Sequence, residues 1–131
     1  MYYSLRKDTS LAKMVNGRRI WVDPNVAFAG DPREDETIWS NTSVYAPELS
    51  RVANLYGRAR DITGASWTEI EQAIANDNPV VMWGTWMNEA PRVQYRWYTP
   101  DGTRIDDVFI GHAFLLVGYD ASSVFIADPG K

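Results

Sequence analysis

The chain has 131 residues and a mass of 14.9 kDa, which is the size of one ordinary domain. Its composition, 45% hydrophobic and 23% charged, excludes a disordered or low-complexity protein. The formal net charge of −4 argues against a nucleic-acid-binding protein, which normally carries a basic face, and no apolar run approaches the roughly 20 residues of a membrane span.

The sequence contains no cysteine and a single histidine, His112. These counts exclude disulfides, cysteine-type zinc sites and a thiol nucleophile within the chain, and they argue against a histidine-based metal site. We therefore expect neither a metal nor a cofactor. The N-terminus also lacks the basic segment followed by an apolar one that is typical of an export signal.

The N-terminal third of the chain predicts one short helix and a long loop. Asp8 favours the start of a helix over residues 8–15, which Asn16-Gly17 would end. Residues 18–22 fit a short strand. Residues 21–45 are rich in Asp, Pro, Gly and Asn without a regular period, so we expect a structured loop there.

Two further helices are expected in the middle of the chain. Pro47 suits the first position of a helix whose apolar residues recur at helical spacing up to Gly57. Ser66 and Glu69 have the spacing of a capping box, which predicts a second helix that ends before Pro79.

Strands dominate the rest of the chain. Residues 80–86 form a nearly continuous apolar run, as expected of a strand that is covered on both faces. Residues 93–98 alternate, and residues 112–119 and 124–127 predict two strands joined as a hairpin. Helices followed by an antiparallel sheet predict the α+β class.

His112 begins one strand of this hairpin, and Asp128 follows the end of the other. Both residues then lie at one end of the sheet, where a carboxylate can hold an imidazole in one tautomer. An even loop that pairs Tyr119 with Val124 would put Asp128 on the face opposite His112. A three-residue loop that pairs Tyr119 with Ser123 would make them diagonal neighbours, about 7–8 Å apart at the backbone. A catalytic role for the pair therefore requires an odd loop or a bulge.

Simpler interpretations of these residues are open as well. His112 also fits a half-buried histidine that satisfies one hydrogen bond at a strand end, and Asp128 fits a turn former before Pro129-Gly130. Ser10 and Lys13 match the Ser-x-x-Lys pattern of penicillin-binding enzymes, but the Lys-Thr-Gly and Ser-Asp-Asn elements of those enzymes are missing.

Acidic and aromatic residues each allow two interpretations. Six carboxylates are consistent with a calcium site, but their spacing does not match an EF-hand loop, so we expect a solvated acidic loop instead. These six are Asp31, Glu34, Asp35, Glu36, Asp106 and Asp107. Trp67 and Trp83 are expected in the core. Four other aromatic residues either pack around the sheet or line a groove for an extended ligand, namely Trp86, Tyr95, Trp97 and Tyr98.

The C-terminal segment contains His112-Ala113, then Val117-Gly118-Tyr119 and, at the end of the next strand, Asp128-Pro129. This order resembles the C-terminal half of papain-like cysteine peptidases. It is most similar to the bacterial peptidases related to the double-glycine leader peptidases of bacteriocin export, whose second strand ends in Asp-Pro. The resemblance extends from about Leu11 to Gly130 and includes residues 21–25, 28–32, 44–47, 61–66 and 78–83.

The resemblance implies a papain-like fold in which His112 matches the catalytic base and Asp128 its orienting partner. In that family the nucleophilic cysteine and the oxyanion-hole glutamine open a helix that precedes the segment seen here. Residues 1–3 resemble the tail of that helix, and the chain stops at Lys131, where the family continues. We therefore expect a single peptidase-like domain over residues 1–131, truncated at both ends.

Two functional hypotheses follow. The first is a segment of a cysteine peptidase that hydrolyses peptides or proteins with a Cys-His-Asp triad. It would be inactive as given, because an imidazole and a carboxylate cannot perform acyl transfer without a nucleophile. The second is a non-catalytic remnant that binds a peptide or a partner protein. An apolar surface left by the missing helix would favour homo-oligomers. The absence of cysteine suits an exported bacterial protein, but it suits a cytoplasmic one equally.

Overall fold

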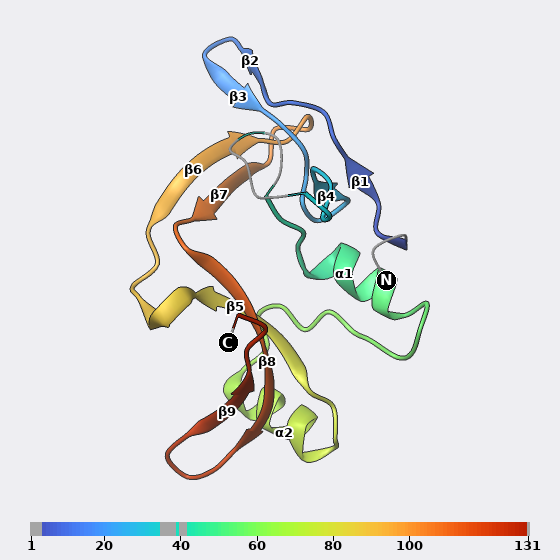
Figure 1. Cartoon of the computed structure of the whole chain (residues 1–131), viewed down its shortest axis with the longest axis vertical. Helices are drawn as coiled ribbons and strands as arrows, with labels where there is room; N and C mark the ends of the chain where they lie inside the picture. The colour runs from blue at the N-terminus through green and yellow to red at the C-terminus, as the bar shows by residue number, and fades with distance from the viewer. Residues whose placement is uncertain (1–3, 35–38, 40–41, 131) are drawn as a thin grey trace. The chain divides into compact units, whose positions relative to one another are not determined.

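The computed structural model of the chain describes residues 4–34, 39 and 42–130 (Figure 1). The chain forms two compact units. The first contains the residues up to Thr63 together with Arg96–Asp106, and the second contains Gly64–Tyr95 together with the residues from Asp107 onward. Helices and strands occur in both units, so the protein is α+β, as expected from the sequence.

The first unit contains one helix, α1 (Ala46–Ala53), and several short strands. Strands β1 (Lys7–Asp8) and β4 (Phe28–Ala29) pair in parallel. A four-stranded sheet has the order β2-β3-β6-β7, formed by β2 (Lys13–Val15), β3 (Arg18–Ile20), β6 (Val93–Tyr98) and β7 (Arg104–Val108). The sheet is completed by β6 and β7, the two strands within which the chain passes between the units. Four short strands precede the first helix, and the longer strands β5 to β9 follow both helices, so the expected order of helices before an antiparallel sheet is loosely met.

The prediction of a helix over residues 8–15 is wrong, since β1 and β2 lie in this segment. The reason lies in Asn16-Gly17, which the prediction used as a helix stop. Both residues have positive φ, 49° at Asn16 and 74° at Gly17. This is the backbone of a two-residue hairpin turn, for which Asn-Gly is the strongest short-range signal. The turn pairs Val15 with Arg18 and continues into an antiparallel ladder.

Tryptophans form the core of the first unit. Trp97 and Trp21 are almost completely buried, their ring centroids are 5.3 Å apart, and Trp39 packs edge-on against both. Each buried indole N–H has a backbone acceptor: Trp97 donates to the carbonyl of Val22 at 2.8 Å, and Trp21 donates to that of Ser10 at 2.7 Å. The apolar rings are therefore buried without leaving a polar atom unsatisfied.

A buried carboxylate connects α1 to the N-terminal segment. Glu48 is only 2% exposed, and its carboxylate accepts hydrogen bonds from the Arg51 guanidinium at 2.6 and 2.7 Å. It also accepts one from the backbone N–H of Arg6 at 2.8 Å, while Arg51 donates to the carbonyl of Ser4. The hydrogen bonds from the Arg51 guanidinium lower the pKa of Glu48 below its ordinary value, and the hydrogen bond from the Arg6 N–H lowers it further.

The second unit contains a three-stranded antiparallel sheet and α2 (Trp67–Ala75). The sheet has the order β5-β8-β9, formed by β5 (Val80–Thr85), β8 (Gly111–Tyr119) and β9 (Val124–Ala127). The capping box at the start of α2 is confirmed, because Ser66 accepts from the Glu69 N–H and the Glu69 carboxylate accepts from the Ser66 N–H. Helix α2 contacts β5 and β8 (Figure 1). A short 3-10 helix, η2 (Trp86–Asn88), follows β5.

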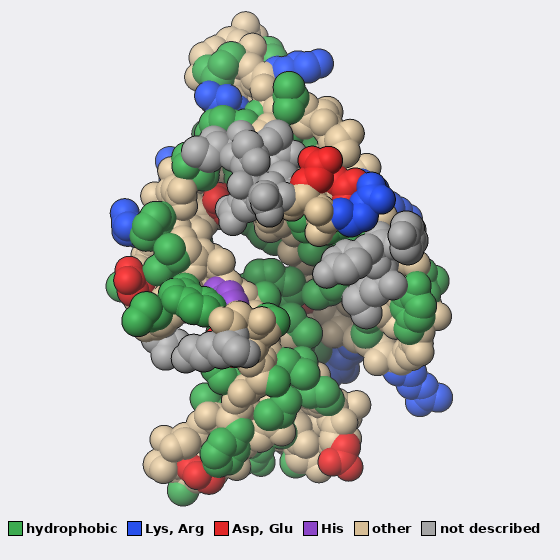
Figure 2. All heavy atoms as spheres, in the orientation of Figure 1, with side chains coloured by type: hydrophobic (Ala, Val, Ile, Leu, Met, Phe, Trp, Pro, Cys, Tyr) green, Lys and Arg blue, Asp and Glu red, His purple; other side chains and the backbone are tan. Residues whose placement is uncertain are grey.

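Much of the apolar surface of this sheet is exposed. Trp67 and Trp83, both expected in the core, are 46% and 42% exposed, so that prediction is wrong. The expectation that residues 80–86 are covered on both faces is also wrong, since Val81 is exposed while Val80 is buried. All four residues of β9 are exposed as well, and hydrophobic side chains reach the surface around β8 and β9 (Figure 2).

Two of the carboxylates considered for a calcium site, Asp31 and Asp106, are paired with basic side chains. Asp31 is 8% exposed, not solvated as expected, and it accepts from Arg33 and Lys7, which hold its pKa well below the ordinary range. Asp106 accepts from Arg96. Asp35 and Glu36 lie outside the described residues. Within the described part of the chain, no helix has the length and apolar character needed to cross a membrane.

We expect Glu48→Ala to reduce the free energy of unfolding by roughly 3 kcal/mol, because it removes one partner of a buried ion pair and leaves the Arg6 N–H without its acceptor. Urea unfolding followed by circular dichroism measures this change. Glu71→Ala, which removes a carboxylate from a half-exposed position on α2, is the matched control and should cost less than about 1 kcal/mol. Equal losses in the two variants would contradict a structural role for the Glu48 network.

The same carboxylate should make stability depend on pH. Because the pKa of Glu48 is lowered in the folded state, the unfolded chain takes up a proton at a higher pH than the folded chain does. Its contribution is therefore complete above the ordinary carboxyl pKa and is lost as pH falls. The difference in unfolding free energy between the wild type and Glu48→Gln should shrink between pH 7 and about pH 3. A constant difference would contradict this linkage.

Candidate functional site

A β-bulge sets the register of the β8–β9 hairpin. Tyr119 pairs with Val124 and Gly118 with Phe125, but the next pair is Leu116 with Ile126, so Val117 is an extra residue in β8. The loop between the strands is therefore the even loop considered in the sequence analysis, and the bulge supplies the odd residue. The Asp120 carboxylate fixes this loop by accepting from the backbone N–H groups of Ser122 and Ser123.

The bulge brings Asp128 to the same face as His112. Beyond it, Leu115 pairs with Ala127, so Asp128 comes level with Phe114, two residues from His112 along β8. Without the extra residue the pairing that starts at Tyr119 would have carried Asp128 to the other face, because a one-residue shift inverts every side chain. The imidazole Nε2 lies 2.8 Å from the Asp128 Oδ1.

The His112–Asp128 pair is partly shielded from water. The two side chains are 19% and 14% exposed, and part of the imidazole is visible as the purple patch in Figure 2. Partial burial strengthens a hydrogen bond to a carboxylate, since fewer water molecules compete for it. On the neighbouring strand β5 the residue opposite His112 is Gly84, which has no side chain to cover the ring.

Asp128 combines the two roles that the sequence left as alternatives. Its Oδ1 accepts from the backbone N–H of Gly130 at 2.8 Å, which is the local turn expected before Pro129-Gly130. The same oxygen lies at hydrogen-bonding distance from His112. The turn therefore fixes the carboxylate in the position from which it contacts the imidazole.

This contact determines which imidazole nitrogen is available for chemistry. A carboxylate can only accept a hydrogen bond, so Nε2 carries the proton that it donates to Asp128. In the neutral imidazole Nδ1 then has the free lone pair and can take a proton from a nucleophile. The pair can thus act as a base with a fixed tautomer, but none of the residues in the chain is a cysteine that could serve as its nucleophile.

The four aromatic residues considered for a ligand groove do not share one environment. Trp97 is buried in the core of the first unit. Trp86 contacts His112, with ring centroids 4.7 Å apart and ring planes at 85°. The sequence placed Trp86 only in the general neighbourhood of the histidine strand, because the contact depends on the pairing of β5 with β8.

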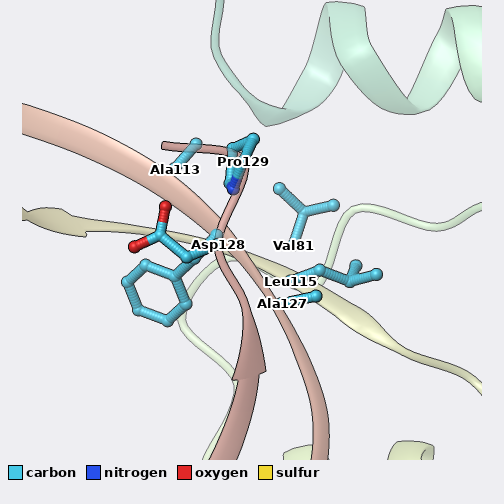
Figure 3. A pocket seen from close by; sticks show the side chains of 7 residues that line it. Val81, Ala113, Leu115, Ala127, Asp128 and Pro129 are labelled. Carbon is cyan, nitrogen blue, oxygen red and sulfur yellow. The ribbon is translucent and has the colours of Figure 1, made fainter. Parts of the chain in front are cut away.

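An apolar pocket of about 390 Å³ lies next to Asp128. It is lined by Val81, Ala113, Phe114, Leu115, Ala127, Asp128 and Pro129. Figure 3 shows the Asp128 carboxylate directed away from Val81, Leu115 and Ala127, so the pocket wall on that side is apolar. Among the described residues, no three His, Cys, Asp or Glu side chains are grouped so that they could hold a metal ion. Residues 1–3, expected to be the tail of a preceding helix, lie outside the described residues.

A family model and a solved structure both relate the chain to one family of peptidases. The model of the Peptidase_C39 like family matches residues 2–131. A crystal structure from Bacillus anthracis, described as a C39-like peptidase, is 29% identical with a TM-score of 0.67, covering 90% of this chain and 58% of that one. YvpB of Bacillus subtilis strain 168, an uncharacterised protein, is 29% identical over 109 residues, which are 82% of this chain and 42% of YvpB. The chain thus spans about half the length of the relatives it matches.

We expect Asp128→Ala to expose the Nε2 proton of His112 to exchange with water at least tenfold faster, because its acceptor is removed. Since the chain has one histidine, NMR of a sample with ¹⁵N-labelled histidine reports on this group alone. Glu71→Ala, which removes a half-exposed carboxylate on α2 in the same unit, is the control and should leave the exchange rate unchanged. An exchange rate unaffected by Asp128→Ala would show that the two side chains are not paired in solution.

Proposed function

The chain belongs to the Peptidase_C39 like family, and on this premise we propose that it supplies the base and the orienting carboxylate of a cysteine peptidase that hydrolyses peptide bonds. His112 is the base and Asp128 the residue that orients it. The observation that carries the proposal is the contact of 2.8 Å between Nε2 and Oδ1, made across a hairpin whose bulge brings both side chains to one face.

In this proposal each nitrogen of the imidazole has one role. Nε2 donates to Asp128 throughout, which prevents the ring from rotating. Nδ1 takes the proton of a cysteine thiol, and the resulting thiolate attacks the carbonyl carbon of the peptide bond. The same Nδ1 then gives its proton to the leaving amine. Water hydrolyses the thioester, again with Nδ1 as the base, and the thiol is restored.

The nucleophile in this proposal lies outside the 131 residues. Two facts support this placement: the chain contains no cysteine, and it spans only 42% of YvpB and 58% of the Bacillus anthracis chain. The side chains of this chain do not replace the thiol, since an imidazole paired with a carboxylate binds and moves protons but forms no acyl intermediate by this route. We accordingly propose that the chain is a segment, truncated at both ends, of a single peptidase-like domain.

A second candidate function is a non-catalytic domain that binds a peptide or protein. The observation that favours it is the apolar pocket beside Asp128, together with the exposed apolar residues of β9. Such a domain would keep the sheet and the pocket but would have no use for the tautomer that Asp128 imposes on His112. The two candidates therefore differ in how they respond to substitution of the imidazole.

We expect the complete reading frame that contains these residues to cleave fluorescein-labelled casein, and we expect the 131-residue chain alone not to do so. Iodoacetamide should inactivate the complete protein by alkylating the thiol. His112→Ala should reduce kcat/KM by roughly 10²–10⁴-fold, which is the usual contribution of a general acid–base residue. Glu71→Ala, on α2 in the same unit, is the matched control and should keep full activity.

Three outcomes would contradict the peptidase proposal. They are cleavage by the 131-residue chain alone, activity of the complete protein that survives His112→Ala, and a complete reading frame without cysteine. A complete protein that does not cleave but binds unlabelled casein equally well with and without His112→Ala would favour the non-catalytic domain.

A further inference from the structure

Trp86 approaches the His112–Asp128 pair from a different strand. It follows β5, and its ring meets the imidazole edge-on with centroids 4.7 Å apart. The backbone N–H of Trp86 donates to the carbonyl of Ile110 at 2.9 Å, which continues the β5–β8 pairing one residue beyond Thr85 and Gly111. Because side chains alternate along a strand, Trp86 lies on the same face as Gly84, the residue opposite His112.

The same ring also lies against the turn that fixes Asp128. A Cβ placed on Gly130 would be 2.6 and 2.8 Å from two carbon atoms of the Trp86 ring, which is closer than real contacts allow. The backbone at Gly130 is therefore packed directly on the indole. Since the Gly130 N–H donates to the Asp128 carboxylate, Trp86 contacts both the imidazole and the turn that holds its partner.

The backbone around Trp86 is held in an unusual conformation. Met87 has a φ of 59° and Ile110 a φ of 51°, although both are bulky residues that rarely adopt positive φ. The hydrogen bond from the Trp86 N–H to the Ile110 carbonyl lies between these two positions, and the Thr85 hydroxyl donates to the Glu89 carbonyl across the turn. Such conformations persist only where the surrounding contacts over-determine them, and they concentrate at functional sites.

We propose that Trp86 is a positioning residue for the His112–Asp128 pair and that Gly130 is the position that admits its ring. The indole covers one side of the imidazole and excludes water from the hydrogen bond between Nε2 and Oδ1. It also restricts rotation of the imidazole, so that the lone pair of Nδ1 keeps a fixed orientation. The catalytic meaning of this role rests on the proposed function, but the packing and its effect on the hydrogen bond do not.

Each of the two effects of the ring has its own physical basis. A hydrogen bond to a carboxylate weakens when water can replace either partner. The indole lies 4.7 Å from the imidazole, centroid to centroid, and in this proposal it occupies part of the volume from which water would approach. An aromatic ring that meets another edge-on also favours one relative orientation of the two planes. Gly130 contributes by the absence of a side chain, because a Cβ there would collide with the indole and would also lie 3.3 Å from the Asp128 Oδ1.

The experiment measures the rate at which the Nε2 proton of His112 exchanges with water in the 131-residue chain labelled with ¹⁵N-histidine. We expect Trp86→Ala to raise this rate at least tenfold and Trp86→Phe, which keeps an aromatic ring, to raise it less than threefold. Gly130→Ala should raise it like Trp86→Ala, although the tryptophan is still present. The control is Trp67→Ala, which removes a half-exposed tryptophan that packs edge-on against Tyr119 in the same unit; it should leave the rate unchanged.

Far-UV circular dichroism establishes that each variant is folded. If Trp86→Ala does not fold, the comparison of Trp86→Phe and Gly130→Ala with the wild type decides the question. The proposal is overturned if folded Trp86→Ala or Gly130→Ala exchanges within twofold of the wild type, or if Trp67→Ala has the same effect as Trp86→Ala.

Asp128→Ala separates this inference from the proposed function. If Asp128→Ala accelerates exchange but folded Trp86→Ala does not, the pair exists and only the role of Trp86 is wrong. If Asp128→Ala has no effect, the pair itself is absent in solution, and the proposed function loses the observation that carries it.

Discussion

The geometry of the site depends on the register of one hairpin. His112 and Asp128 are on neighbouring strands, and an even loop alone would have left them on opposite faces of the sheet. A single unpaired residue in β8, Val117, shifts the pairing by one position. This bulge interrupts the ladder once and places the Asp128 carboxylate on the same face as the imidazole. The contact between the two side chains, the tautomer of His112 and the availability of Nδ1 all follow from it.

Three glycines of the second unit make room for aromatic rings. A Cβ on Gly84 would lie 2.9 Å from the Phe114 ring, one on Gly118 would lie 3.0 Å from the Phe125 ring, and one on Gly130 would collide with Trp86. In each case an aromatic side chain lies across a backbone without a side chain of its own. These three rings can therefore lie where they do because the facing positions on β5, on β8 and after β9 are glycines.

The two units differ in how they bury apolar surface. The first has a closely packed tryptophan core and a buried Glu48–Arg51 pair that fastens its N-terminal segment. In the second, the buried hydrophobic residues among those described are Val80 and Leu116, while β9 is exposed along its whole length. The unit that contains the His112–Asp128 pair therefore has the thinner core. An apolar surface of this kind is what a sheet shows when it lacks a covering layer.

The sequence by itself determined the features that depend on neighbouring residues. The capping box at Ser66, the α+β class and the placement of His112 and Asp128 at one end of a hairpin all follow from local patterns, because caps, turns and strand periods involve residues only a few positions apart. The Asn16-Gly17 turn is also a local feature, but this dipeptide is compatible both with the end of a helix and with a hairpin turn. Only the pairing of β2 with β3 decided between the two. Tertiary structure alone decided the bulge at Val117, the burial of Trp97 in place of Trp83, and the contact of Trp86 with His112. These features depend on the register between strands and on which faces are covered, and both are set by contacts between residues far apart in the chain.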